Sequence, residues 1–177
     1  MKVLLNDRQI EMAREFAQRR HEAKHISFRN KSRLVAKEKP KTLVEEYIYD
    51  RTHKAHFLGL LGEMAYATAV GEKIDTNIYS VRDTGADVNG AEVKTSTFSG
   101  DGVELKIPQT EFDIKSPKKY ILARLNENRF NEVELVGEIS REDFAKHKTI
   151  KQYGPNNPIN YIVGVQHLEP IQIIYEW

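Results

Sequence analysis

The sequence predicts an α/β fold, a single domain with a mixed central β-sheet flanked by helices. Two patterns favour this class: helical spacing of apolar residues before residue 71, and strand-like alternation or short apolar runs after it. A chain of 177 residues is also long enough for one domain that buries a core. We expect one domain over 1–177, made of a basic helical N-terminal region (1–56) and an α/β core (57–177).

The first helix is predicted near the N-terminus. Asn6 or Asp7 can cap a helix that runs to about His25, because both side chains accept hydrogen bonds from exposed amides of a first turn. The segment 28–41 is polar and basic and contains Pro40 near its end. It is typical of a loop, or of an arm that orders on a partner.

The second helical stretch begins with a capping box of Thr42 and Glu45. We expect it to break near 50–53 and to resume as an amphipathic helix over 57–70. Gly71 is the natural end of that helix, since glycine adopts the left-handed conformation that closes helices.

The remaining elements are mostly strands. A short helix is expected from Ser140 and Asp143 to about Lys146, and 154–158 is a loop rich in glycine, proline and asparagine. Strands are expected at 77–82, 85–88, 91–97, 103–107, 120–125, 133–139, 160–167 and 170–175.

A tight hairpin is predicted at Asn89-Gly90. This dipeptide is favoured in the two-residue type I′ turn, whose central residues both need positive φ. Val88 and Ala91 flank it and would close the turn as a pair.

The same register places charged residues together. Asp87 would stand opposite Glu92, at ~5 Å between Cβ atoms, and Lys94 would share their face because strand side chains alternate. Like charges in direct register repel, so the pair favours a bound cation such as Mg²⁺, held with water and substrate phosphate oxygens. The chemistry indicated is phosphodiester hydrolysis. The alternative is a solvated hairpin in which Lys94 screens two surface acids.

The spacing Asp87-x₄-Glu92-x-Lys94 resembles the core motif of the PD-(D/E)XK, or restriction-endonuclease-like, nuclease superfamily. The resemblance spans roughly 57 to 145 and implies a restriction-endonuclease-like core and a metal-dependent DNA endonuclease. It implies that Asp87, Glu92, Glu63 and the main chain of Val93 hold Mg²⁺ or Mn²⁺, and that Lys94 acts with the acids in catalysis.

Two positions leave alternatives open. The family's usual proline before the first acid is replaced by Ala86, and Asp83 is a second candidate for the acid, though it would lie farther from Glu92 than Asp87 does. Glu63 adjoins the apolar stripe of its helix, so it is either a metal ligand or a polar-face residue.

Charge is unevenly distributed along the chain. The total is only +1, but residues 1–56 hold 14 Lys and Arg against 8 Asp and Glu. Such density suits contacts with the phosphate backbone of DNA, the expected partner, or is simply a solvated face. The residues expected to bind DNA are Arg14, Arg19, Arg20, Lys24, Arg29, Lys31 and Arg33.

A second metal motif is His21-Glu22-x-x-His25, which matches the H-E-x-x-H pattern of zinc proteases. The neighbouring basic side chains disfavour a dication and no clear third ligand follows, although His53 and His56 remain candidates. Helix-surface or phosphate-facing histidines are the simpler interpretation.

Other features narrow the function classes. The absence of cysteine excludes disulfides and thiolate chemistry, and Gly-rich nucleotide loops and the serine-hydrolase elbow are missing. No apolar run reaches the length of a membrane span, so we expect a soluble, cytoplasmic protein. Double-strand cleavage would favour a homodimer. The remaining alternative is a non-catalytic nucleic-acid-binding module on a nuclease-like fold.

Overall fold

The structure is a computed structural model that describes residues 1–32, 43–75, 86–98, 100, 102–126 and 129–173, with side chains described outside 23–52. The described elements are β1 (Lys2–Leu4), α1 (Asp7–Ser32), α2 (Leu43–Val70), β2 (Ala91–Ser96), β3 (Glu104–Pro108), α3 (Gln109–Ile114), β4 (Lys119–Leu125), β5 (Glu132–Ser140), α4 (Arg141–His147), β6 (Thr149–Lys151), β7 (Asn160–Gly164) and a 3₁₀ turn (Val165–His167).

Two sheets form the centre of the fold. The first has the strand order β1-β5-β4-β2 and is mixed, because β2 runs parallel to β4 while the other neighbours are antiparallel. The second has the order β3-β7-β6 and is antiparallel. The expected α/β class with a mixed sheet flanked by helices is therefore confirmed, whereas the second sheet was not predicted.

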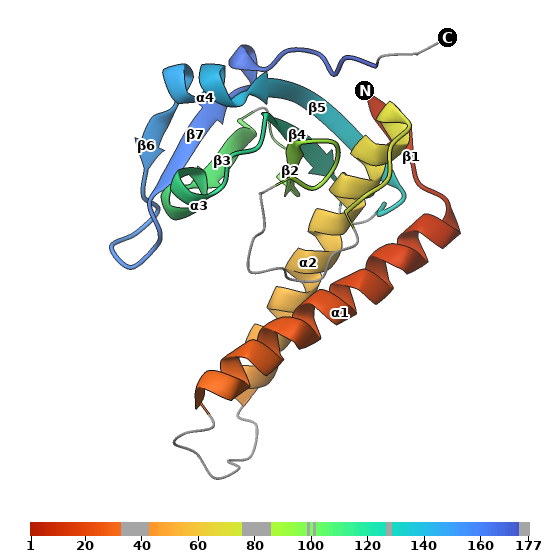
Figure 1. The fold of residues 1–177 in the computed structure, drawn as a ribbon, viewed down its shortest axis with the longest axis vertical. Coiled ribbons are helices and arrows are strands. Elements are labelled where there is room, and N and C mark those ends of the chain that lie inside the picture. Colours follow the sequence, from red (N-terminus) through yellow and green to blue (C-terminus); the bar gives the residue numbers. More distant parts are fainter. Residues whose placement is uncertain (33–42, 76–85, 99, 101, 127–128, 174–177) are drawn as a thin grey trace.

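Two apolar cores lie on opposite faces of the mixed sheet. Ile121 and Ala123 of β4 pack into a core shared with α1 and α2, while Tyr120 and Leu122 pack into a second core with β3, β7, α3 and α4. The alternation of side chains along one strand thus supplies both cores. Figure 1 shows the two long helices as a pair that extends beyond the sheets.

The helical pair corrects two expectations. Helix α1 continues through 28–32, part of the predicted loop, and α2 is unbroken over 50–53. Neither glycine nor proline occurs from residue 7 to 39 or from 41 to 58, and the Arg and Lys of these segments are good helix formers. No glycine or proline therefore interrupts α1 over 28–32 or α2 over 50–53, and the expected boundary between residues 56 and 57 falls inside α2.

Two glycines fix where α2 lies and ends. Gly71 has φ +72°, and the amide of Glu72 donates to the carbonyl of Ala67 at 2.9 Å, so the helix closes as expected. A Cβ at Gly62 would lie 2.1 Å from Oγ1 of Thr95 on β2. This close approach brings the middle of α2 directly against β2.

The later elements agree with the sequence in part. Helix α4 begins where expected, with Oγ of Ser140 accepting from the amide of Asp143 at 3.0 Å. The strand expected over 160–167 ends at Gly164 and continues as the 3₁₀ turn, and 170–173 form no strand. The strand expected at 77–82 lies outside the described residues, and β1, α3 and β6 were not predicted.

No helix in the described ranges is both long enough and apolar enough to cross a membrane.

Candidate active site

The predicted turn is present. Asn89 has φ 45° and Gly90 has φ 80°, the positive values that a type I′ turn requires. Val88 and Ala91 form an antiparallel bridge and exchange both main-chain hydrogen bonds, at 3.2 and 2.8 Å. The local sequence therefore determines this reversal of the chain.

The hairpin stops after that single bridge, which corrects the expected strand at 85–88. The amide of Asp87 donates to the carbonyl of Ala91 at 2.8 Å, and the carbonyl of Asp87 accepts from the amide of Asp75 at 2.8 Å. Asp87 therefore does not stand opposite Glu92 in a ladder. Beyond the turn, β2 pairs with β4 instead, which takes it away from the preceding segment.

Asp87 lies at the edge of β2. Within the described residues β2 is the last strand of its sheet, and Oδ2 of Asp87 accepts a hydrogen bond from the amide of Val93 at 2.8 Å. The side chain of Val93 itself belongs to the core against α2. The carboxylate of Asp87 thus accepts from the Val93 amide on the open edge of β2, and it lies between the two faces of the sheet.

Glu92 and Lys94 occupy the face opposite to Val93, as alternation along a strand requires. Nζ of Lys94 donates to Oε1 of Glu92 at 2.7 Å. Glu92 is only 4% exposed, so this carboxylate is buried beside its lysine.

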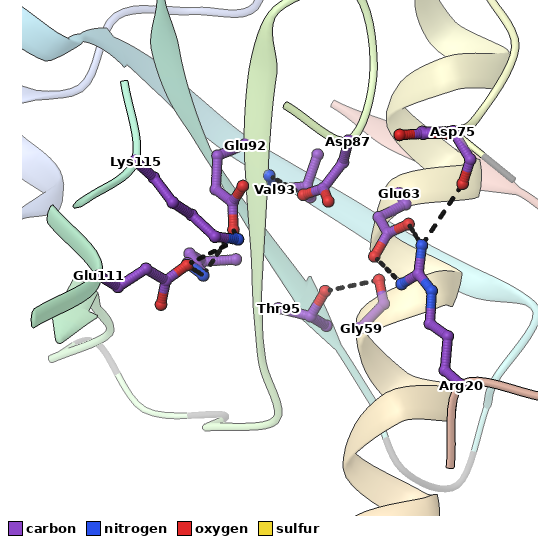
Figure 2. A network of polar contacts seen from close by, with 11 residues as sticks. Arg20, Gly59, Glu63, Asp75, Asp87, Glu92, Val93, Thr95, Glu111 and Lys115 are labelled. Carbon is purple, nitrogen blue, oxygen red and sulfur yellow. Dashed lines mark hydrogen bonds and ion pairs between the residues drawn. The ribbon is translucent and has the colours of Figure 1, made fainter. Parts of the chain in front are cut away.

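Two residues that the sequence did not predict join this arrangement, Glu111 on α3 and Lys115 directly after it. Oε1 of Glu111 lies 2.5 Å from Nζ of Lys94, and Nζ of Lys115 lies 3.4 Å from both Oε1 of Glu92 and Oε1 of Glu111. The only sequence signal was the i,i+4 spacing of Glu111 and Lys115, which is common on helix surfaces. Figure 2 shows Glu111 and Lys115 together on one side of β2.

Glu63 lies on the other side of β2, on α2 (Figure 2). It is 5% exposed, so it is not a solvated polar-face residue. Both its oxygens accept from the guanidinium of Arg20 on α1, at 2.8 and 3.0 Å, and Arg20 also donates to the carbonyl of Asp75 at 3.4 Å. Arg20, which was expected to bind DNA, therefore forms an ion pair with Glu63, a predicted metal ligand.

The three carboxylates interact electrostatically. Burial raises the pKa of Asp87 well above its ordinary value, and the charges of Glu63 and Glu92 raise it further, while the Val93 amide and Lys94 oppose the rise. Asp87 is thus the centre of an acidic group that extends around the edge of β2, with Glu63 toward α2 and Glu92 toward α3. We call Glu63, Asp87 and Glu92 the acidic group.

Lys94 is a cation in this arrangement. Burial alone would lower its pKa, but Glu92 and Glu111 outweigh burial and raise it. The pKa of Glu92 is raised, chiefly by burial and against the effect of Lys94. Lys94 is therefore placed to donate hydrogen bonds and to stabilise negative charge rather than to accept a proton.

Carboxylate oxygens are the donors that hard divalent ions prefer, but no three His, Cys, Asp or Glu side chains among the described residues converge closely enough to hold a metal. Oε2 of Glu92 is buried and has no hydrogen-bond partner, so this carboxylate has an unused acceptor. Mg²⁺ commonly binds one or two carboxylates and completes its shell with water and substrate phosphate. Asp87 and Glu92 match that donor chemistry.

Apart from Arg20, the expected DNA-binding residues fall into three groups. Arg14 and Arg19 are exposed, with their guanidinium carbons 5.8 Å from the ring of Phe57 and 5.6 Å from that of Phe16. Lys24, Arg29 and Lys31 lie on α1, but their side chains are outside the described part. Arg33 and the alternative acid Asp83 also lie outside the described residues.

The H-E-x-x-H segment is arranged differently from a surface zinc motif. His21 is fully buried in line with Ala13 and Ala17, and its ring packs edge-on against that of His53 at 6.0 Å. Glu22 is exposed and accepts from Gln18 at 2.6 Å. The expectation of a helix-surface His21 was wrong, because its i+4 spacing from Ala17 places it on the packed face of α1.

Comparison with known proteins gives no relative: no protein-family model, curated protein or solved structure matches this chain.

Proposed function

We propose that the chain is a Mg²⁺-dependent endonuclease that hydrolyses phosphodiester bonds of DNA on a PD-(D/E)XK-like site. The observation that carries the proposal is the acidic group beside a protonated lysine: burial and the charges of Glu63 and Glu92 raise the pKa of Asp87, and Nζ of Lys94 donates to Glu92 at 2.7 Å. Acids forced together in a buried setting are typical of functional sites.

Each residue has a role in the proposed reaction. Asp87 and Glu92 would hold Mg²⁺, with the carbonyl of Val93 and the carboxylate of Glu63 as further donors. The ion, when bound, supplies Lewis-acid stabilisation of phosphate charge and a more acidic bound water. Lys94 orients the attacking water and stabilises charge on the phosphate, because its raised pKa keeps it protonated. Mn²⁺ would suit the same donors.

A cleavage assay on plasmid and linear DNA tests this proposal. We expect cutting with Mg²⁺ and none with chelator, and we expect Asp87→Ala or Lys94→Ala to lower the rate by about 100-fold or more. Circular dichroism would verify that each variant is folded. Wild-type rates in either folded variant would refute the assignment.

A second candidate is a non-catalytic nucleic-acid-binding module. The ion pairs favour it: Glu63 is held by Arg20, and Glu92 by Lys94 and Lys115, so two of the three acids already have cationic partners in the protein. In that case Mg²⁺ would leave the melting temperature unchanged, whereas a metal-binding site would raise it by preferential binding to the folded state.

A further inference from the structure

A hollow of about 300 Å³ lies where the sheet β3-β7-β6 meets the end of α4. Its lining comes from the start of β3, the end of β7, the 3₁₀ turn and the last residue of α4, and it includes neither the acidic group nor its cationic partners. Figure 1 shows α4, β6 and β7 away from the two long helices. Ligand pockets range from about 300 to 1,000 Å³, so this hollow suits a molecule of the size of one heterocyclic base.

Two stacked histidines line the hollow. The rings of His147 and His167 are nearly parallel, with an interplanar angle of 17° and 4.3 Å between their centroids. Both residues are exposed, so the stack is open to a third flat ring. Unpaired nucleic-acid bases stack on histidine and other aromatic side chains in this way. The nitrogen lone pairs of nearly parallel rings do not converge on one point, so the pair suits stacking better than it suits a metal ion.

Polar groups meet in the hollow at Gly164 of β7. Gly164 pairs with Glu104 of β3, and both residues line the hollow together with Gln166 of the 3₁₀ turn. A Cβ at Gly164 would lie 2.3 Å from Oε1 of Gln166, so the amide of Gln166 lies directly over the strand here. The hollow therefore contains an acceptor-only carboxylate and an amide that has both donors and an acceptor.

The carboxylate of Glu104 is held in place and still has acceptor sites. Nζ of Lys151 donates to Oε1 at 3.3 Å and to Oε2 at 3.1 Å, and the hydroxyl of Tyr153 donates to Oε2 at 3.2 Å. A carboxylate has about four acceptor sites, and among the described residues Oε1 accepts from Lys151 alone. A ligand with two neighbouring N–H donors therefore matches this carboxylate.

We propose that this hollow binds a guanine base, which stacks on the histidine pair and donates its N1–H and its amino group to the carboxylate of Glu104. Among the common bases, guanine alone has two adjacent N–H donors on its Watson–Crick edge. Adenine and cytosine have a ring acceptor beside their amino group, and a carboxylate repels that acceptor. The amide of Gln166 has an N–H donor for the carbonyl oxygen of guanine.

A free guanine nucleotide and an unpaired guanine in a single strand present the same base. A guanine inside a duplex does not, because its Watson–Crick edge is paired with cytosine. The proposal goes beyond the nuclease proposed above and does not depend on it, since a neutral base binds here without a metal ion or a cleavable phosphate.

A nuclear magnetic resonance titration of the full chain with guanosine, inosine and adenosine monophosphates provides the first test. The guanine nucleotide should bind about tenfold more tightly than the inosine nucleotide, which lacks the amino group, and adenosine monophosphate should bind more weakly still. The imidazole C–H signals of His147 and His167 should move upfield, because they would lie over the face of the purine. Equal affinity for the guanine and adenine nucleotides would overturn the proposal.

Variants of the lining residues provide the second test. His167→Ala should weaken guanine binding about tenfold through loss of stacking, and His167→Phe should retain most of the affinity because it keeps a flat ring. Glu104→Gln should remove the preference for guanine over inosine nucleotide. Glu142→Gln is the matched control, because it removes the same charge from an 81% exposed side chain of α4 outside the hollow. Melting temperatures would verify folding, and the comparison of nucleotides with the wild type needs no variant.

Single-stranded oligonucleotides distinguish the two sources of the base. A short thymidine strand with one central guanine is compared with the same strand carrying adenine, in chelator so that no metal-dependent cutting occurs. Tighter binding of the guanine strand than of free guanosine monophosphate would assign the hollow to unpaired nucleic acid, and equal or weaker binding would assign it to a free nucleotide. If neither probe binds in a guanine-dependent way, the proposal is rejected, whatever the cleavage assay shows for the proposed nuclease.

Discussion

At the scale of single residues, the charge of Asp87 destabilises the fold, whereas the charge of Lys94 stabilises it. Burial and two neighbouring acids make the charged form of Asp87 unfavourable, whereas Lys94 is favoured as a cation by two carboxylates. A site built to bind a ligand commonly carries such unfavourable charge, because the ligand relieves it. Stability measurements on each residue therefore report on the site without any activity assay.

Asp87→Asn should stabilise the metal-free protein at neutral pH by about 1 kcal/mol, the usual size of a single stabilising change. A raised pKa means that the folded state holds the proton more tightly, so wild-type stability falls as pH rises from the ordinary pKa through the raised one. The asparagine keeps an oxygen that accepts from the Val93 amide, and it carries no charge that burial would make unfavourable.

Urea unfolding with chelator checks this prediction at several pH values. The two proteins should have similar stability below the ordinary aspartate pKa, and the variant should gain at pH 8. A variant that is less stable than the wild type at pH 8 would contradict the charge balance derived for Asp87.

Lys94→Met should destabilise the protein by about 2 kcal/mol, because it leaves Glu92 and Glu111 without their closest cation. The lysine side chain is 24% exposed, which keeps the cost below that of a fully buried pair. Lys2→Met is the control, because the Lys2 side chain is 68% exposed and its surface ion pair with Glu132 should contribute less to stability than the contacts of Lys94. Equal effects in urea unfolding would argue against a special role for the Lys94 contacts.

At the scale of elements, two glycines of α2 test how the helix is placed against the sheet. Gly62→Ala should destabilise by about 1 to 3 kcal/mol, because its Cβ would meet Oγ1 of Thr95 at 2.1 Å and Cβ of Ala123 at 3.3 Å. Gly59→Ala, one turn earlier, meets nothing within 4 Å and should stabilise by about 0.5 to 1 kcal/mol through helix propensity. Thermal unfolding distinguishes these opposite signs, and stabilisation by both would exclude a close contact.

Local chemistry explains which parts of the fold were predictable. The Asn89-Gly90 turn, the glycine end of α2 and the Ser140 cap each depend on residues within a few positions, so their sequence signals were sufficient. The position of Asp87 was not predictable, because it depends on the pairing of β2 with β4, which lies more than twenty residues later in the chain.

The candidate site was predictable to the same extent. The spacing of Glu92 and Lys94 on one strand determined their shared face, and their contact follows from it. Glu111 and Lys115 escaped notice because α3 has six residues and one buried side chain, Phe112, which leaves almost no periodic pattern. When a residue joins a site from an element elsewhere in the chain, the sequence around that residue does not indicate the site.

At the scale of the whole molecule, the N-terminal helical region, residues 1–56, and the rest of the chain carry different net charge. We call this region the helical layer. Residues 1–56 contribute an excess of Lys and Arg, and Arg20 from this layer contacts Glu63 of the acidic group directly. A polyanion bound along α1 would therefore lie next to the carboxylates on which the proposed cleavage depends. The proposed function requires this proximity.

Replacing the exposed pair Arg14 and Arg19 with alanine should weaken DNA binding and reduce its salt slope by about 2, one unit for each lost phosphate contact. The control replaces Lys106 and Lys146, two exposed lysines on β3 and α4, and removes the same charge outside the helical layer. Anisotropy titrations from low to physiological salt measure both. If the two double variants lose affinity equally, net charge alone governs binding and the helical layer has no special role; if only the arginine variant loses it, DNA lies along α1.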